Sequence, residues 1–107
     1  MKSVYEADLE KKLEIVKLLE ADPYGIERED KKSFSRLGYK IKDGSQVDCD
    51  HKKVYLLFRG AEDYIPFIEA KLKDLAKKSE TPTEDKVIAV IEDEESGAEQ
   101  GMGAIFG

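Results

Sequence analysis

Two short apolar runs constrain the fold of this 107-residue chain more than any other feature. Residues 54–58 read VYLLF and residues 87–91 read VIAVI, so an extended backbone there would need burial on both faces. Between them, residues 63–76 carry apolar positions at helical spacing. This order predicts two central, parallel strands joined by a helix in a right-handed β-α-β crossover.

Upstream, residues 3–20 predict an amphipathic helix. Ser3 and Glu6 form an S-x-x-E pattern, which caps a helix start because each side chain can satisfy an unpaired backbone N–H. Asp22-Pro23 would end the helix, since the residue before proline avoids the helical region. The apolar face would consist of Leu9, Leu13, Val16 and Leu19.

Residues 33–50 predict a β-hairpin. A strand over residues 33–42 alternates polar and apolar side chains, and a return strand follows over residues 46–50. Asp43-Gly44 lies between them, and this dipeptide favours hairpin turns because glycine tolerates a positive φ.

Together these elements predict an α+β fold, a two-layer sandwich with a mixed sheet of about four strands and two helices. Both helices would cover one face of the sheet, while the two apolar runs require cover on both faces. We therefore expect the second face to be buried by another subunit, in a homodimer, or by the C-terminal tail.

The formal net charge of −6 is concentrated at the C-terminus. Residues 92–107 contain five acidic residues and no basic residue, whereas residues 1–91 are close to electrical balance. The chain is therefore predicted to consist of a globular α+β domain, residues 1–91, and an acidic, glycine-containing tail, residues 92–107.

Composition indicates a cytoplasmic protein. No apolar stretch approaches the roughly 20 residues of a membrane span, and residues 1–12 lack the apolar core of a signal peptide. The single Cys49 cannot form an internal disulfide. The absence of Asn, together with abundant Lys and Glu, is typical of proteins from hot-growing organisms.

The sequence contains no recognisable catalytic, cofactor or metal pattern, so we predict a non-catalytic protein without cofactor or metal. The densest cluster of metal-ligand types is Asp48, Cys49, Asp50 and His51. Neighbours on a strand alternate faces, and no second Cys or His completes a tetrahedral set. A small-ligand or metal-binding module around these residues remains an alternative.

Basic residues gather in the predicted hairpin, where an aromatic residue shares their strand face. Exposed sheet faces with cations and an aromatic ring bind single-stranded RNA in several folds. RNA binding is therefore an alternative function, and its candidate residues are Lys32, Phe34, Arg36, Lys40 and Lys42.

The chain ends in GMGAIFG after its acidic run. This ending resembles the C-terminal end of archaeal ribosomal stalk proteins, which finish in an acidic stretch followed by a segment like GLGALFG. The direct matches are Gly101, Gly103, Ala104, Phe106 and Gly107. In that family the tail recruits translational GTPases and related factors. The resemblance implies an archaeal-like protein with Met102, Ile105 and Phe106 as its partner-binding anchors.

The main functional prediction is thus a protein-interaction domain that engages a translation factor through its tail. Acidic, glycine-bearing segments stay solvated when free, and a few apolar anchors can order on a partner groove. Two alternatives for the tail itself stay open at this point: residues 102–106 pack back on the sheet face left open by the helices, or the tail is disordered and binds no partner.

Overall fold

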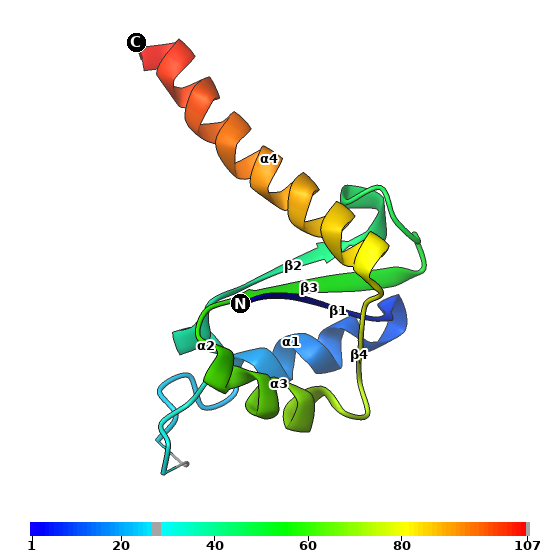
Figure 1. Cartoon of the computed structure of the whole chain (residues 1–107), viewed down its shortest axis with the longest axis vertical. Coiled ribbons are helices and arrows are strands. Elements are labelled where there is room, and N and C mark those ends of the chain that lie inside the picture. The colour runs from blue at the N-terminus through cyan, green and yellow to red at the C-terminus, as the bar shows by residue number, and fades with distance from the viewer. Residues whose placement is uncertain (27–28, 107) are drawn as a thin grey trace.

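The computed structural model describes the backbone of residues 1–26 and 29–106, and the side chains of residues 1–26 and 29–96. A four-stranded antiparallel sheet with strand order β2-β3-β1-β4 forms its centre (Figure 1). The strands are β1 (Lys2–Asp8), β2 (Tyr39–Asp43), β3 (Lys53–Arg59) and β4 (Lys77–Lys78). The helices are α1 (Lys12–Glu20), α2 (Phe34–Leu37), α3 (Ile65–Leu72) and α4 (Thr81–Phe106). Short 3-10 turns are η1 (Leu9–Lys11), η2 (Gly44–Gln46) and η3 (Glu62–Tyr64).

The two central strands, β1 and β3, pair along their whole length, from Lys2 opposite Arg59 to Asp8 opposite Lys53. Their inner residues are buried on both faces. This confirms the two-sided burial predicted for residues 54–58. The β-branched and aromatic side chains of this segment suit a strand that packs against other elements above and below.

One face of the sheet packs against α1, α2 and α3, and aromatic rings dominate that core. The Phe58 ring of β3 lies 5.8 Å from the Tyr5 ring and 5.5 Å from the Phe34 ring, centroid to centroid. Phe34 in turn lies 4.9 Å from Phe67 of α3. Ring pairs at these separations stabilise a core beyond the area they bury.

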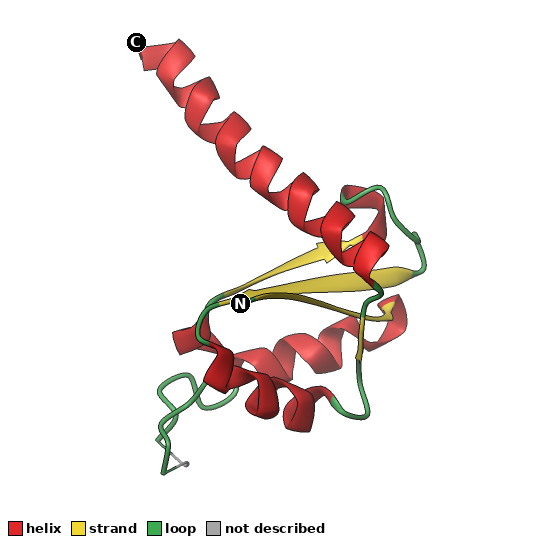
Figure 2. Ribbon diagram, viewed as in Figure 1, coloured by secondary structure: helices red, strands yellow, loops and turns green. Residues whose placement is uncertain are grey.

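The opposite face packs against α4, so helices lie on both sides of the sheet (Figure 2). Val87 and Ile91 of α4 are buried against Val4 and Leu57 of the central strands. The fold therefore has three layers, and the two-layer prediction is wrong on this point. The homodimer was predicted because one face of the sheet was expected to be exposed. In the described part of the chain, α4 covers that face.

The predicted α+β class and four-stranded sheet are confirmed, whereas the mixed sheet and the β-α-β crossover are wrong. Every strand pair is antiparallel. Residues 87–91 belong to α4. Pro82 is tolerated in the first turn of this helix, because a backbone N–H at that position would have no partner within the helix. In that helix Val87 and Ile91 are one turn apart and share the buried face.

The predicted helix over residues 3–20 is wrong in its first half. Lys2–Asp8 forms β1, because pairing with β3 on one side and β4 on the other satisfies its backbone. The helix proper begins at Lys12 and buries Ile15 and Leu19. Leu13, which the sequence pattern placed on the buried face, is 75% exposed.

The predicted hairpin over residues 33–50 is also wrong. Its first residues form α2, which Ser33 caps by accepting a 3.1 Å hydrogen bond from the Arg36 backbone N–H. Strand β2 follows but pairs with β3. The expected return strand is replaced by η2 and a tight turn, in which a side chain at Gly44 would lie only 1.7 Å from the Asp50 carbonyl oxygen.

Helix α4 crosses the sheet and then continues beyond the body of the molecule (Figure 1). Its first turns also contact the backbone of β1, where the Glu84 carboxylate accepts a 3.0 Å hydrogen bond from the Val4 backbone N–H. Within the described part of the chain, no helix has the length and apolar character needed to cross a membrane.

Candidate functional site

The five residues of the predicted basic hairpin face do not share a face. Lys40 and Lys42 lie on the α4 side of β2, because their cross-strand partners Leu57 and Tyr55 belong to the core beneath α4. Phe34 points into the opposite core and is only 2% exposed. It therefore cannot stack on a nucleic-acid base.

The remaining two predicted residues also lie on the other side of the sheet. The Lys32 ammonium is 3.1 Å from the Asp63 carboxylate and 5.4 Å from the centre of the Tyr64 ring. Arg36 is exposed on α2. The contacts of Lys32 connect the loop before α2 to η3. Lys32 and Arg36 are thus on the opposite side of the sheet from Lys40 and Lys42.

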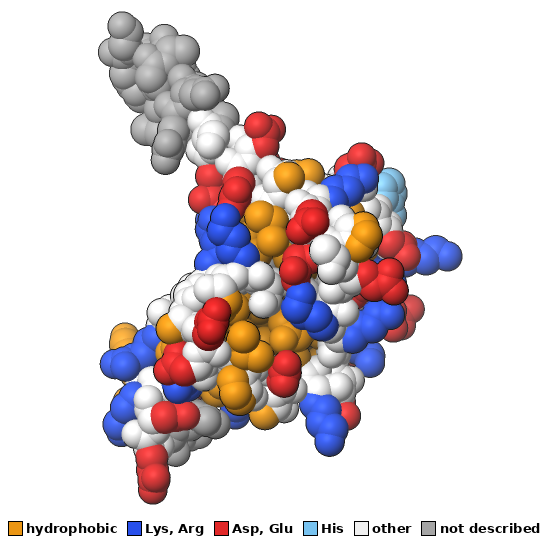
Figure 3. Space-filling model, viewed as in Figure 1, with side chains coloured by type: hydrophobic (Ala, Val, Ile, Leu, Met, Phe, Trp, Pro, Cys, Tyr) orange, Lys and Arg blue, Asp and Glu red, His pale blue; other side chains and the backbone are white. Residues whose placement is uncertain are grey.

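A different set of cations surrounds the contact between α4 and the sheet, and we call it the basic sheet face. Cross-strand pairing places its members on one side of the three longer strands. Side chains of opposite charge lie next to one another where α4 leaves the sheet (Figure 3). The basic sheet face consists of Lys2 of β1, Lys40 and Lys42 of β2, and Arg59 of β3.

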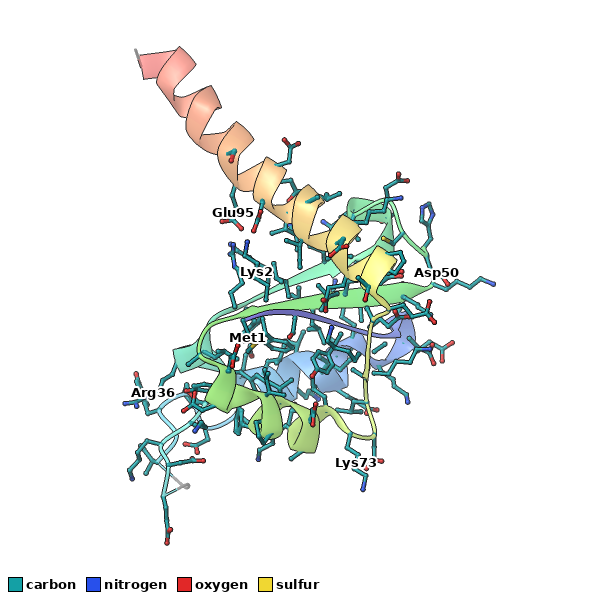
Figure 4. All side chains as sticks on the ribbon, in the orientation of Figure 1. Met1, Lys2, Arg36, Asp50, Lys73 and Glu95 are labelled. Atoms are coloured by element: carbon teal, nitrogen blue, oxygen red, sulfur yellow. The ribbon has the colours of Figure 1, made fainter. Side chains whose placement is uncertain are left out.

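Three acidic residues of α4 pair with this face, one to each strand. Their side chains are partly exposed, and Lys2 and Glu95 mark the junction in Figure 4. The hydrogen bond from Lys2 lowers the pKa of Glu92, and the charges of Lys2 and Arg59 add to that effect. The pairs are Glu92 with Lys2, Glu94 with Lys42 at 3.0 Å, and Glu95 with Arg59 at 3.0 Å.

These pairs bring together residues that the sequence assigned to separate parts. The acidic run was predicted to begin a solvated tail at residue 92, yet Glu92, Glu94 and Glu95 contact the sheet. The backbone of α4 then continues to Phe106. The predicted anchors Met102, Ile105 and Phe106 lie in its last turns, and their side chains are outside the described residues.

The loop after η2 contains the residues of the predicted metal-binding alternative. No group of three metal-ligating side chains that could hold an ion occurs among the described residues. Burial raises the pKa of the Cys49 thiol, with smaller contributions from the nearby acids Asp48 and Glu6, against an opposing effect of Lys86. The thiol donates a 3.4 Å hydrogen bond to the Val47 carbonyl oxygen. A thiol that resists ionisation is a poor nucleophile.

Next to this loop, Glu6 and Lys53 form a partly buried ion pair between the two central strands. The Lys53 ammonium lies 2.6 Å from the Glu6 carboxylate. Burial alone would raise the pKa of Glu6, but the hydrogen bond from Lys53 and the charges of Lys53 and Lys77 outweigh it, so that pKa lies below its usual value. The same hydrogen bond raises the pKa of Lys53. The pair lines a hollow of about 440 Å³ beside Cys49 and Tyr55.

Replacing Glu6 with Gln should lower the free energy of unfolding at pH 7 by about 1–3 kcal/mol, because Lys53 loses its charged partner. The folded pKa of Glu6 is below the ordinary value of 4.5. Its stabilisation is therefore complete above pH 4.5 and is lost as the pH falls through the folded pKa. Urea unfolding between pH 7 and pH 2.5 should show a difference that shrinks on acidification. The exposed Glu10→Gln is the matched control, and a difference that grows in acid would contradict the assignment.

Comparison of the chain with protein-family models, with curated proteins and with solved structures finds no match. The arguments about function therefore come from the chain itself: its sequence, the docking of α4, and the charges around that contact.

Proposed function

We propose that this chain is a non-catalytic protein-interaction domain that presents the end of α4 to a translation factor. The observation that carries the proposal is the division of α4 into two parts. Its first turns are fixed to the sheet, and its last turns extend beyond the body (Figure 1). A helix held at one end offers its other end to a partner.

The fixed part of α4 is held by three kinds of contact. Val87 and Ile91 are buried in the core, and the Glu84 carboxylate accepts a hydrogen bond from Val4 of β1. The ion pairs of the following turn add contacts to three strands. This attachment gives α4 a defined direction relative to the sheet, so a partner would meet a preoriented element.

Helical spacing supports an apolar partner-binding stripe on the extended part. At about 100° per residue, positions 91, 98, 102 and 105 all fall within about 60° of position 87. The stripe that covers the sheet thus continues in the sequence with Ala98, Met102 and Ile105 after a break at Glu94 and Glu95. An apolar stripe in a short segment is the usual way in which a helix docks into a partner groove.

The resemblance of GMGAIFG to the end of archaeal stalk proteins supports a translational GTPase as the partner. Such a partner acts in the cytoplasm. The glycines at positions 97, 101 and 103 each cost roughly 1 kcal/mol of helix stability relative to alanine. A partner groove would offset that cost on binding. The acidic residues next to the stripe would steer it toward a basic surface.

The test measures binding of the full chain to a purified archaeal translational GTPase by fluorescence anisotropy. We expect micromolar binding by the full chain and at least a tenfold loss for a chain ending at Ser96, because the apolar anchors are then absent. Ile105→Asp should cause a similar loss, whereas Asp93→Asn, a charge change of the same size beside the ion pairs, should change affinity less than threefold.

The shortened chain keeps Val87, Ile91 and the three paired acids, so its thermal midpoint should stay within about 2 °C of the full chain, as for other changes outside the core. Equal affinity of the full and shortened chains for the GTPase would refute the proposal. So would a large fall in the thermal midpoint on truncation, since it would mean that residues 97–107 belong to the core.

A further inference from the structure

We propose that the basic sheet face, Lys2, Lys40, Lys42 and Arg59, binds single-stranded nucleic acid through its phosphates, and that Glu92, Glu94 and Glu95 compete for it. The inference is independent of the tail's partner. It rests on four cations that three strands place on one face, and on the acidic turn of α4 that contacts three of them.

The cations are close enough to contact consecutive phosphates of one strand. Lys2 and Arg59 are directly opposite each other on neighbouring strands. Neighbouring strands lie roughly 5 Å apart, and residues two apart on one strand, such as Lys40 and Lys42, lie roughly 7 Å apart. Arginine can bind a phosphate through two parallel hydrogen bonds, and lysine acts as a point charge.

One part of this face is open. Lys40 and Arg59 line a hollow of about 280 Å³ at the edge of this face, together with Leu37, Gly38 and Tyr39. Lys40 is exposed and has no ion pair among the described residues. A phosphate can therefore enter beside Arg59 before any carboxylate is displaced.

The acidic turn can give way without undocking the helix. Its three pairs involve partly exposed side chains, and exposed ion pairs contribute little to stability. Val87 and Ile91, which attach α4 to the core, precede this turn. Because Glu92, Glu94 and Glu95 are tethered beside the cations, they compete at a high effective concentration.

The shape and chemistry of this face favour a single strand that is read through its backbone. Helix α4 rises from the face (Figure 1), so a rigid duplex would collide with it, whereas a flexible strand can pass alongside. Tyr55, the aromatic residue of this face within the described chain, is buried beneath α4. Without an exposed ring for base stacking, binding should depend little on base sequence.

The test uses two full-length variants with the same change in net charge. The first, Glu92→Gln/Glu94→Gln/Glu95→Gln, frees the three cations. The second, Glu80→Gln/Asp85→Asn/Asp93→Asn, removes acids that have no ion pair among the described residues. Anisotropy of a fluorescein-labelled 12-residue oligouridine measures affinity at about 50 mM salt. We expect the first variant to bind roughly tenfold more tightly than the second.

Further substitutions in the first variant locate the site. Adding Arg59→Ala or Lys40→Ala should lower affinity at least fivefold, whereas adding Lys17→Ala, on the exposed side of α1, should not. The slope of log affinity against log salt should be close to −2.8 for four phosphates, and it should become less negative by about 0.7 with each cation removed. Thermal melts establish that each variant is folded.

Equal affinities of the two charge-matched variants would overturn the proposal, because the gain would then come from net charge alone. No binding of the oligouridine by either variant would also overturn it. If poly-glutamate binds and the oligouridine does not, the face is a site for acidic protein segments, and the assignment to nucleic acid is wrong.

Discussion

Phe58→Ala should lower the free energy of unfolding by about 3–5 kcal/mol, as expected for the loss of a fully buried ring from a well-packed core. The ring is 0% exposed and contacts both Tyr5 and Phe34, so its removal leaves a cavity between the sheet and the helices beneath it. A domain of this size has a total stability of roughly 5–15 kcal/mol. Urea unfolding followed by far-UV circular dichroism measures the change.

Leu13→Ala is the control, because that side chain is 75% exposed on α1. Its cost should stay within about 0.5 kcal/mol, as for most surface substitutions. Leu13→Ala also tests the structure against the sequence pattern, because the pattern placed Leu13 on the buried face of a helix, where its loss would be costly. Similar costs for the two substitutions would mean that the core beneath the sheet is packed differently.

Ile91→Ala should lower the free energy of unfolding by about 2–5 kcal/mol and loosen α4 from the sheet. The side chain is 1% exposed in the core that Val4 and Leu57 share with α4. The Val4 amide provides a local probe, since it donates to Glu84 of the same helix. Its hydrogen exchange should accelerate more than that of the amides beneath α1 and α3.

Asp93→Ala is the matched control on the same helix, because Asp93 is exposed. It should change neither the unfolding free energy by more than about 0.5 kcal/mol nor the exchange of the Val4 amide. Uniform acceleration of exchange across all core amides in Ile91→Ala would contradict local release of α4. It would indicate that helix and sheet unfold only together.

The sequence predicted β3 correctly and α4 incorrectly from the same kind of apolar run. A run of five apolar residues is compatible with a buried strand or with part of a buried helix. The flanks differ: β3 ends at Arg59-Gly60, whereas residues 87–91 continue into EDEE, in which the three glutamates are good helix formers. Giving that extension more weight would have favoured the helix.

The identity of β1 could not be read from local pattern. Ser3 and Glu6 match a helix cap, but Lys2–Asp8 is stabilised by pairing with β3, about fifty residues away. Such nonlocal pairing overrides a local propensity of this size. A local signal did exist for α2, since serine is a preferred residue before the first turn of a helix. In the structure the Ser33 hydroxyl accepts a hydrogen bond from the Arg36 backbone N–H.

The sequence could identify some of the charged residues of the candidate site but not which of them contact one another. The sequence singled out Lys40, Lys42 and the acidic run, but no local pattern indicates that Glu94 pairs with Lys42. Likewise, Lys2 and Arg59 carry no motif, and antiparallel register alone brings them together. Charges from four separate elements meet because of the tertiary fold, which single-sequence reasoning does not reach.

The attachment of α4 near its start has a mechanical consequence. About fifteen residues separate Ile91 from the last helical residue, Phe106, which at 1.5 Å per residue is a lever arm of about 22 Å. A tilt of about 10° about the Val87–Ile91 fulcrum would sweep the tip through roughly 4 Å. Small changes in how the helix packs on the sheet are thus magnified at the C-terminal end of α4.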